Sequence, residues 1–320
     1  DVVAAGPADQ WRYDPWGAEI HDGWMYGRGA GDMKAGLIAN LFALKAIDAI
    51  GLRPRGDVML QAVIDEEAGG CGGTLACLAQ GYRGDALLIP EPDGLHMTVA
   101  TAGVCYFRVR VEGRPAHAAA GHLGVNAIAR AALVVQALTA LDEERGAGIH
   151  HALLDNGTGR SCHLNVGTMR AGEWPSTVPA EAVIECRMGF VPGETLQEIR
   201  ALVLSTIDRV ADADAWLKEH RPTVEWYGWQ ASPWEQDTAH PFIQSVKAQA
   251  DAVLGRPTRF QGVPAGVDTR FAAYFDMPAV SCGPVAERIH GANERVHVPS
   301  IVATAKIVAS TVLDWCGAAE

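Results

Sequence analysis

The chain has 320 residues, enough for two domains of ordinary size, and 48% of them are hydrophobic, which can supply the cores. A formal charge of −12 without any Lys/Arg-rich run argues against binding to nucleic acids or anionic membranes, which needs a basic surface. The seven cysteines are scattered and form no CxxC pair, so we expect neither a zinc knuckle nor disulfides, and a reducing, cytoplasmic location. No apolar stretch approaches the roughly 20 residues that span a bilayer.

The first hundred residues alternate between helical and extended patterns. Apolar residues from Leu37 to Ile47 recur at spacings of three and four, which predicts an amphipathic helix over 34–51. Apolar runs predict buried strands at 57–64, 86–90 and 96–103, with a short helix between the first two. This alternation predicts an α/β layer with a largely parallel sheet.

The middle of the chain has a different pattern. In "CYFRVRVEG" (105–113) apolar and polar residues alternate, as in a sheet with one face in water. Predicted helices and strands near 128–138, 162–169, 180–187, 196–210 and 222–229 complete the order β-α-β-β-α-β of a ferredoxin-like unit. We therefore expect a ferredoxin-like α+β domain (104–225) inserted into an α/β domain formed by 1–103 and 226–320.

Two adjacent glutamates give the first indication of function. In "VIDEEAGG" Glu66 and Glu67 follow the predicted strand 57–64 and precede a Gly-rich turn. A carboxylate beside a core strand needs a cation or a shifted pKa, and no Lys or Arg lies nearby in the sequence. A metal ion is the next candidate partner.

Three more side chains fall after predicted strands or turns: Asp32 in "YGRGAGDMKAG", Glu91 in "IPEPDG" and His290 in "RIHGANERV". Each alone has an ordinary explanation, as a helix N-cap, a solvated loop acid and a plain histidine. Because the carboxyl ends of strands in an open α/β sheet converge on one crevice, together they predict a site for divalent metal. A carboxylate there can bridge two ions, and one of two adjacent glutamates can bind metal while the other acts as base.

Six motifs carry a family resemblance. In this order and spacing, "GRGAGDMKAG", "DEEAGG", "PEPDG", "GRPAHAA", "STVPAEA" and "IHGANE" resemble the dinuclear zinc aminoacylase family, which includes acetylornithine deacetylase, succinyl-diaminopimelate desuccinylase and glutamate carboxypeptidase. The resemblance covers the whole chain. It implies a zinc-exopeptidase-like catalytic domain, an inserted lid domain, and two divalent metal ions, either zinc or alternatively cobalt or manganese.

The same resemblance implies a role for each acidic residue of the predicted site. Asp32 would bridge the two ions. Glu67 and His290 would hold one ion and Glu91 the other. Glu66 would be the general base that activates water.

Three residues of the inserted domain also match family positions. His117 in "GRPAHAA" matches a histidine that, in dimeric members, reaches the neighbouring subunit's site and stabilises the oxyanion, which implies a homodimer through this domain. Arg187 in "ECRMGF" matches an arginine used for the substrate carboxylate. Ser176 stands where many members have an asparagine that contacts substrate, so the specificity of the family does not carry over.

The start of the chain departs from the family pattern. The family's site opens with His-x-Asp-Val-Val, and this chain begins at the Asp, as "DVVAAGP". The resemblance makes Asp1 the residue that orients a metal-binding histidine, and that first-site histidine is absent from this sequence. We therefore expect an N-terminally incomplete chain that binds one of the two ions loosely and is nearly inactive alone.

The expected activity is removal of an N-acyl group from an amino acid or related amine, as in a deacetylase or desuccinylase. The expected partner is a small N-acylated amino acid or a short peptide. A dipeptidase or carboxypeptidase of the same family is the alternative enzyme, because the chemistry is shared. A non-catalytic binding protein that keeps the fold is a third possibility, against which the retained acids and His290 argue.

Overall fold

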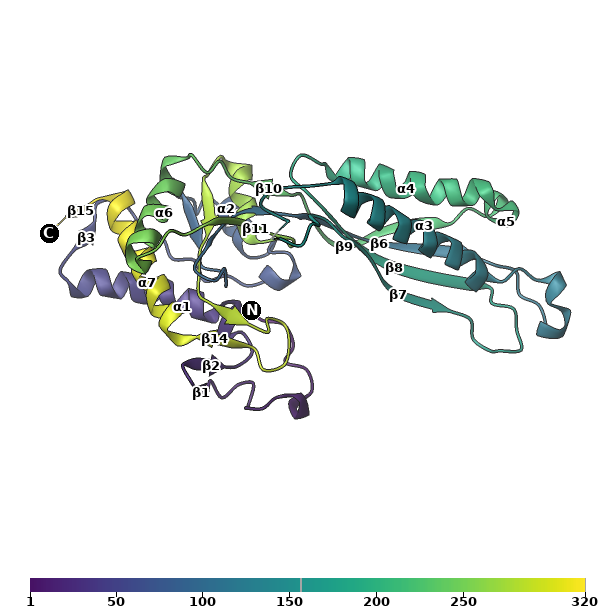
Figure 1. The fold of residues 1–320 in the computed structure, drawn as a ribbon, viewed down its shortest axis with the longest axis horizontal. Coiled ribbons are helices and arrows are strands. Elements are labelled where there is room, and N and C mark those ends of the chain that lie inside the picture. The colour runs from purple at the N-terminus through teal and green to yellow at the C-terminus, as the bar shows by residue number, and fades with distance from the viewer. Residues whose placement is uncertain (156, 320) are drawn as a thin grey trace. The chain divides into compact units, whose positions relative to one another are not determined.

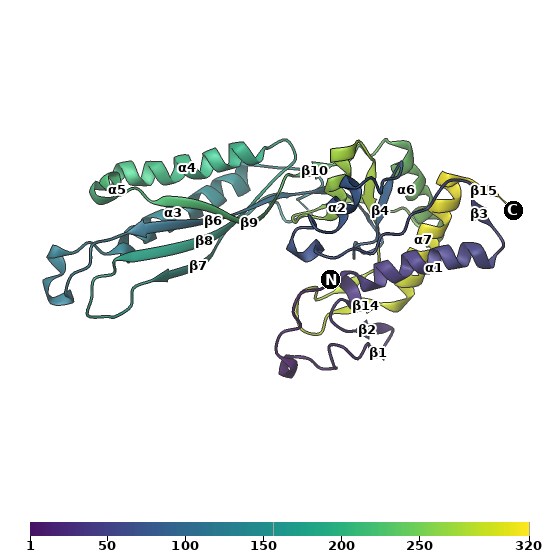
Figure 2. The same cartoon turned by 180° about the vertical axis from the view of Figure 1, so that it is seen from behind.

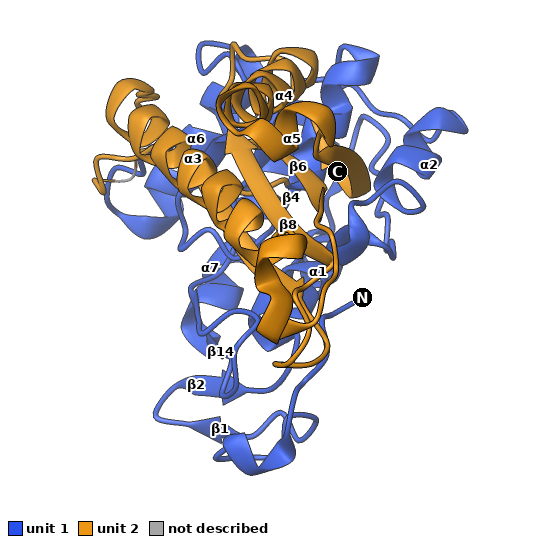
Figure 3. Ribbon diagram, turned by 90° about the vertical axis from the view of Figure 1, so that its right-hand side faces the viewer, with its two compact units in different colours: residues 1–100, 235–261, 267–320 blue, residues 101–234, 262–266 orange. Residues whose placement is uncertain are grey.

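The chain forms two compact units in the computed structural model, which describes residues 1–155 and 157–319. Unit 1 comprises Asp1–Ala100, Glu235–Gln261 and Val267–Glu320, and unit 2 comprises Thr101–Trp234 and Gly262–Gly266 (Figure 3). The sequence predicts these borders between residues 103 and 104 and between residues 225 and 226. The second border lies later in the chain than predicted. Strand β9 (Thr223–Ala231) pairs with β6 (Gly103–Glu112) and therefore belongs to unit 2.

Unit 2 is a four-stranded antiparallel sheet with two long helices on one face (Figure 1). The sheet order is β7 (Leu164–Ala171), β8 (Glu181–Phe190), β6 and β9. Helix α3 (Ala127–Gly148) follows β6, and α4 (Leu196–Ala213) with the short α5 (Ala215–Glu219) follows β8. The predicted ferredoxin-like order is confirmed.

Local side-chain caps begin both long helices. The Asn126 Oδ1 accepts the N–H of Ile128, and Thr195 forms a reciprocal capping box with Glu198. These contacts satisfy N–H groups that a helix start leaves unpaired.

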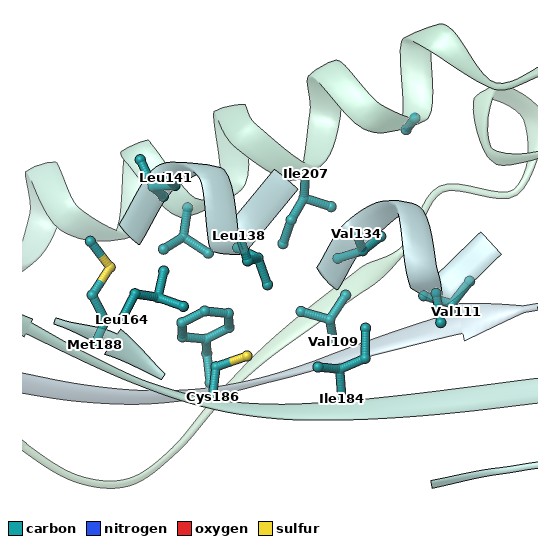
Figure 4. Close-up of a cluster of buried hydrophobic side chains, with 14 of the residues drawn as sticks. Val109, Val111, Val134, Leu138, Leu141, Leu164, Ile184, Cys186, Met188 and Ile207 are labelled. Carbon is teal, nitrogen blue, oxygen red and sulfur yellow. The ribbon is translucent and has the colours of Figure 1, made fainter. Parts of the chain in front are cut away.

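The apolar face of β6 forms the core of unit 2, as its alternating pattern predicts. Val109 of β6 and Ile184 of β8 face Leu138 of α3 and Ile207 of α4, and all are buried (Figure 4). Burying an aliphatic side chain of this size contributes roughly 1.5–3 kcal/mol. The sheet is therefore fixed against the helices, and its other face carries the charged side chains.

The main sheet of unit 1 is mixed. Its order is β10 (Trp234–Glu235), β5 (Met97–Thr101), β12 (Ala279–Ser281) and β4 (Leu87–Ile89), and β11 (Phe260–Val263) also pairs with β5. Strand β12 is parallel to β4 and antiparallel to β5. The predicted strands at 86–90 and 96–103 are confirmed, as is the short helix α2 (Thr74–Ala79).

Helix α7 (Val298–Cys316) packs against both α1 (Ala35–Ala49) and α6 (Pro241–Leu254) (Figure 2). The predicted helix 34–51 exists, and Ile47 of the expected apolar face is buried, but Leu41 of that face is not. Ala39 and Ala43 are buried, whereas Leu41 is 41% exposed. Small side chains let the two helices approach closely, which favours the alanine face at the α7 contact.

The predicted strand at 57–64 is wrong. This segment belongs to no sheet in the described part of the chain, and Met59 and Ile64 are 53% and 68% exposed. A strand needs a neighbour to pair its N–H and C=O groups, and β4 pairs only with β12. The apolar side chains of 58–63 line a cavity of about 760 Å³, together with Leu44 of α1 and Trp315 of α7.

A second, small antiparallel sheet in unit 1 was not predicted. Its order is β1 (Ile20–His21), β2 (Trp24–Tyr26), β14 (Arg295–His297) and β13 (Ala286–Glu287). Strands β3 (Arg53–Pro54) and β15 (Ala318–Ala319) form a separate pair. Short helical turns complete the chain at Ala8–Gln10, Ala30–Lys34, Glu66–Ala68, Ala118–Leu123 and Asp268–Phe275. The pairing of β2 with β14 joins the two ends of the sequence within unit 1.

Helix α7 has the length and composition of a candidate membrane span, which the sequence analysis did not expect. Within the described residues it is the one such helix. Its buried positions include Ser300, Thr304 and Thr311, beside Ile307 and Val308. This packing against α1 and α6 is the arrangement of a helix within a folded unit.

Candidate metal centre

Asp32 lies on the loop that leads from β2 into α1. Gly29 has a φ of +74°, and a Cβ there would lie 2.3 Å from Val2 Cγ1, so this turn needs glycine. The N–H groups of Gly31 and Asp32 donate to Oε1 of Glu294 at 2.9 and 3.1 Å. The loop backbone is thus fixed where the Asp32 side chain leaves it.

Glu66 and Glu67 lie on the turn Glu66–Ala68, after the segment 57–64. The turn begins at Asp65, whose φ is +73° and whose Oδ2 accepts the N–H of Gly72 at 2.8 Å. The Nη2 of buried Arg270 donates to the carbonyl of Gly69 at 2.7 Å. Side-chain contacts therefore hold both ends of the turn.

Glu91 follows strand β4 and is 7% exposed. The charges of Glu66 and Asp32 act on its carboxyl group. Two residues later, the Asp93 carboxylate accepts hydrogen bonds from Thr98 Oγ1 at 2.5 Å and from Ser281 Oγ. Asp93 thereby ties the turn that carries Glu91 to strands β5 and β12.

His290 lies between β13 and β14, with a left-handed φ of 63°. Its Nε2 lies 3.1 Å from Asp32 Oδ2 and 3.2 Å from Glu67 Oε2. One ligand atom from each of these three residues lies within 4.8 Å of the others. The structure thus brings together an imidazole and two carboxylates from three distant parts of the sequence.

The sequence prediction that one sheet positions all of these residues is wrong. Glu91 follows a strand of the main sheet, but Asp32 and His290 follow strands of the small sheet β1-β2-β14-β13. Glu66 and Glu67 follow a segment that is not a strand. Residues of two sheets and one turn meet at the site.

Burial and mutual repulsion raise the pKa values of the clustered carboxyl groups. Burial, with the charges of Asp268 and Asp32, raises the pKa of Glu66 to about 8. Burial and the charge of Glu66 raise the pKa of Glu91 well above its usual value. Burial also raises the pKa values of Asp32 and Glu67, partly opposed by their interactions with His290. The cluster carries more negative charge than its neighbours compensate.

These residues fit a bound divalent cation. Two carboxylates and one imidazole form a donor set that suits a borderline ion such as Zn²⁺. Buried Oε1 of Glu91 has no hydrogen-bond partner among the described residues, which leaves a carboxylate oxygen free to bind metal. A dication would also stabilise the ionised form of all four acids.

Asp1 is exposed and lines the same cavity as Asp32, Glu66, Glu67 and Glu91. Asp1, predicted to orient a metal-binding histidine, thus forms part of the wall of this cavity. The apolar side chains of 58–63 line another part of the cavity wall.

The remaining predicted residues lie in unit 2. His117 caps the turn Ala118–Leu123, where its Nδ1 accepts the N–H of Ala119 at 3.1 Å. The N–H of Ala118 donates to the carbonyl of Ser176 at 2.9 Å, so His117 and Ser176 lie on adjoining segments. Arg187 lies on β8, and its Nη2 donates to the carbonyl of Pro264 at 3.2 Å.

Sequence reasoning missed the side chains that hold the site's backbone: Arg28, Asp93, Arg270 and Glu294. Glu294 belongs to the motif "IHGANE", but nothing in that motif identifies its partner, which lies 266 residues away. Arg270 follows Asp268 in "VDTRF", a charged pair next to apolar residues, which is the one local signal of a buried role.

The sequence matches the model of peptidase family M20/M25/M40 over residues 1–314. The chain belongs to this family. It is 26% identical to the N-formyl-4-amino-5-aminomethyl-2-methylpyrimidine deformylase of Bacillus subtilis, over 99% of this chain and 78% of that protein. The corresponding deformylase of Halalkalibacterium halodurans is 25% identical over 99% of this chain and 77% of that protein.

Solved structures share the fold at low sequence identity. The M20 family metallo-carboxypeptidase Sso-CP2 from Sulfolobus solfataricus has a TM-score of 0.75 at 16% identity, over 98% of this chain and 82% of that one. The di-peptidase Dug1p from Saccharomyces cerevisiae has a TM-score of 0.74 at 17% identity, over 99% of this chain and 78% of that one.

Family membership confirms the main inferences drawn from the six motifs. The chain is a metal-dependent hydrolase of amide bonds with a mixed α/β fold and an inserted domain.

Proposed function

We propose that this chain removes a small acyl group from an amine or amino acid at a site for two divalent metal ions. Glu67 and His290 would hold one ion, Glu91 the other, and Asp32 both. The observation that carries the proposal is the cluster of Asp32, Glu67 and His290 ligand atoms within 4.8 Å, beside two further acids, Glu66 and Glu91.

The ions, zinc in our proposal, would supply a water of lowered pKa and a Lewis acid for the amide carbonyl. Glu66 does the proton chemistry: its carboxylate takes a proton from the attacking water and delivers it to the leaving amine nitrogen. Glu66 is suited to this because it lies in the cluster without the His290 contact that Glu67 makes.

Three residues of unit 2 are proposed to contact the substrate. Since Nδ1 of His117 accepts a backbone hydrogen bond, the neutral ring carries its proton on Nε2, which can donate to a developing oxyanion. The guanidinium of Arg187 is proposed to bind a substrate carboxylate, and the exposed hydroxyl of Ser176 a polar substrate group.

A deacylase is preferred over a peptidase because of the Bacillus subtilis relative, which is named for removing an N-formyl group. The solved carboxypeptidase and dipeptidase structures share the fold at under 20% identity and leave the substrate open. We also propose a cytoplasmic location, which the seven free cysteines favour, and a homodimer through unit 2.

The test is a substrate panel with added Zn²⁺, Co²⁺ or Mn²⁺. N-formyl, N-acetyl and N-succinyl amino acids and amines are compared with dipeptides, and Glu66→Gln serves as the inactive control. Metal-dependent release of the acyl group supports the proposal. Faster cleavage of dipeptides would make the chain a peptidase, and no hydrolysis with any metal, although two ions are bound per chain, would favour a binding protein.

A further inference from the structure

A buried ion pair joins the loop that carries Asp32 to the loop that carries His290. Nη1 of Arg28 contacts Oε2 of Glu294, and the two side chains are 2% and 1% exposed. Both residues belong to unit 1, at opposite ends of the sequence.

Each partner of the pair also bonds to the backbone of the other loop. Glu294 Oε1 accepts the N–H groups of Gly31 and Asp32, as described above. In the opposite direction, Nη2 of Arg28 donates to the carbonyl of Gly291, the residue after His290, at 3.0 Å. The pair therefore contacts Asp32 itself on one side and the neighbour of His290 on the other.

The His290 loop needs such support because its backbone is strained. Arg288 and His290 have φ values of 57° and 63°, a region that residues other than glycine adopt only uncommonly, although histidine does so more often than arginine. Such conformations persist only where surrounding contacts determine them. On the opposite loop, a Cβ on Gly31 would lie 2.6 Å from Ala286 Cβ, so this loop closely approaches strand β13, which leads into the His290 loop.

We propose that Arg28 and Glu294 are positioning residues that fix Asp32 relative to His290 and so set the metal affinity of the site. The inference rests on the proposed function, because it assumes that Asp32 and His290 bind metal. A buried ion pair is weak evidence for stability, since desolvation offsets much of the attraction. A planar guanidinium with fixed hydrogen-bond directions does specify geometry.

The test measures Co²⁺ affinity by equilibrium dialysis, the absorption spectrum of bound Co²⁺, and the unfolding temperature of the metal-free protein. Glu294→Gln keeps an oxygen for the two N–H donors but leaves Arg28 unpaired. Arg28→Lys keeps the positive charge but loses the planar guanidinium, whose Nη2 donates to the carbonyl of Gly291. If Glu294→Gln does not fold, Arg28→Lys carries the test.

The matched control is Glu194→Gln in unit 2. It breaks another, partly buried pair, in which Arg145 Nη1 and Nη2 each lie 2.8 Å from a Glu194 oxygen. This control lowers the unfolding temperature without involving a proposed metal ligand. Residues that support metal ligands typically change affinity about 10–100-fold, so we expect that loss and an altered Co²⁺ spectrum in Arg28→Lys and Glu294→Gln alone.

Wild-type Co²⁺ affinity in both variants, or an equal loss in Glu194→Gln, would overturn the inference. Asp32→Asn, measured in parallel, separates this from failure of the proposed function. If Asp32→Asn loses Co²⁺ and the Arg28 and Glu294 variants do not, only the positioning role is wrong. If Asp32→Asn binds Co²⁺ like the wild type, both the proposed site and the inference are wrong.

Discussion

Glu66 and Glu67 are neighbours in sequence but have different surroundings. Glu67 Oε2 lies 3.2 Å from His290, within the three-residue cluster, whereas the charged groups acting on Glu66 include Asp268 and Arg270. This difference supports the separate roles that the resemblance implies, with Glu67 a metal ligand and Glu66 the base.

Glu66→Gln should retain metal and lower turnover by at least about 10²–10⁴-fold, because it removes the group that accepts the proton. Glu67→Gln is the matched control, and it should lose metal. Metal analysis and kcat on both variants check this. If Glu66→Gln loses metal while Glu67→Gln retains it, the two assignments are reversed.

Asp93 should make the metal-free protein less stable as pH rises. Desolvation raises the pKa of Asp93 from 3.8 to about 7, against the pull of the Ser281 and Thr98 hydroxyls. The folded state therefore binds more protons than the unfolded state between these values, so the Asp93 contribution to stability is complete below pH 3.8 and lost as pH rises through about 7.

Asp93→Asn should flatten the dependence of unfolding free energy on pH between about 4 and 7, measured by urea denaturation with chelator present. Exposed Asp48→Asn is the control and should leave the slope unchanged. An unchanged slope in Asp93→Asn would show that other carboxyl groups of the cluster account for it.

At the scale of elements, the segment 57–64 shows the limit of reading an apolar run. Its composition predicts a buried strand, but composition does not show whether a pairing partner exists. Leu44 and Trp315, apolar residues of two predicted helices, line the same cavity as this segment. For these residues too, the sequence pattern does not show whether a partner is present to bury the side chain. Periodicity did predict unit 2, where β6 has partners on both edges and helices on its apolar face.

Leu60→Ala should therefore cost less than about 1 kcal/mol of unfolding free energy, as for a surface position, because Leu60 is 38% exposed. Leu78→Ala is the matched control in the same unit, since Leu78 is 1% exposed, and should cost about 2–5 kcal/mol. Denaturation of both variants checks this. Equal costs would mean that 57–64 is packed as a core strand in solution.

At the scale of the whole molecule, the motifs predicted which residues form the site but not how they meet. Asp32 and His290 are brought together by the pairing of β2 with β14, and these strands are too short to leave a periodic pattern. The Arg28–Glu294 contact could not be read from the sequence either, because an ion pair across 266 residues has no local signal. Ligand types are local chemistry, whereas their convergence is a property of the tertiary fold.

Dimerisation through unit 2 is a prediction at this scale. Strand β7 is at an edge of the sheet β7-β8-β6-β9, where another copy can pair. If His117 serves the partner's site, mixing inactive Glu66→Gln with inactive His117→Ala should restore part of the activity through heterodimers. No recovery after demonstrated subunit exchange would place the action of His117 within its own chain, or exclude it.

The central claim is that Asp32, Glu67 and His290 form a metal centre, and zinc content after equilibrium dialysis tests it most directly. Wild-type protein and Asp32→Asn are dialysed against the same Zn²⁺ solution, and bound zinc is measured by elemental analysis. We predict about one tightly bound zinc per chain in the wild type and a large loss in Asp32→Asn, since Asp32 is the carboxylate that both proposed ions would share. Equal zinc in the two proteins, or none in the wild type, would contradict the account.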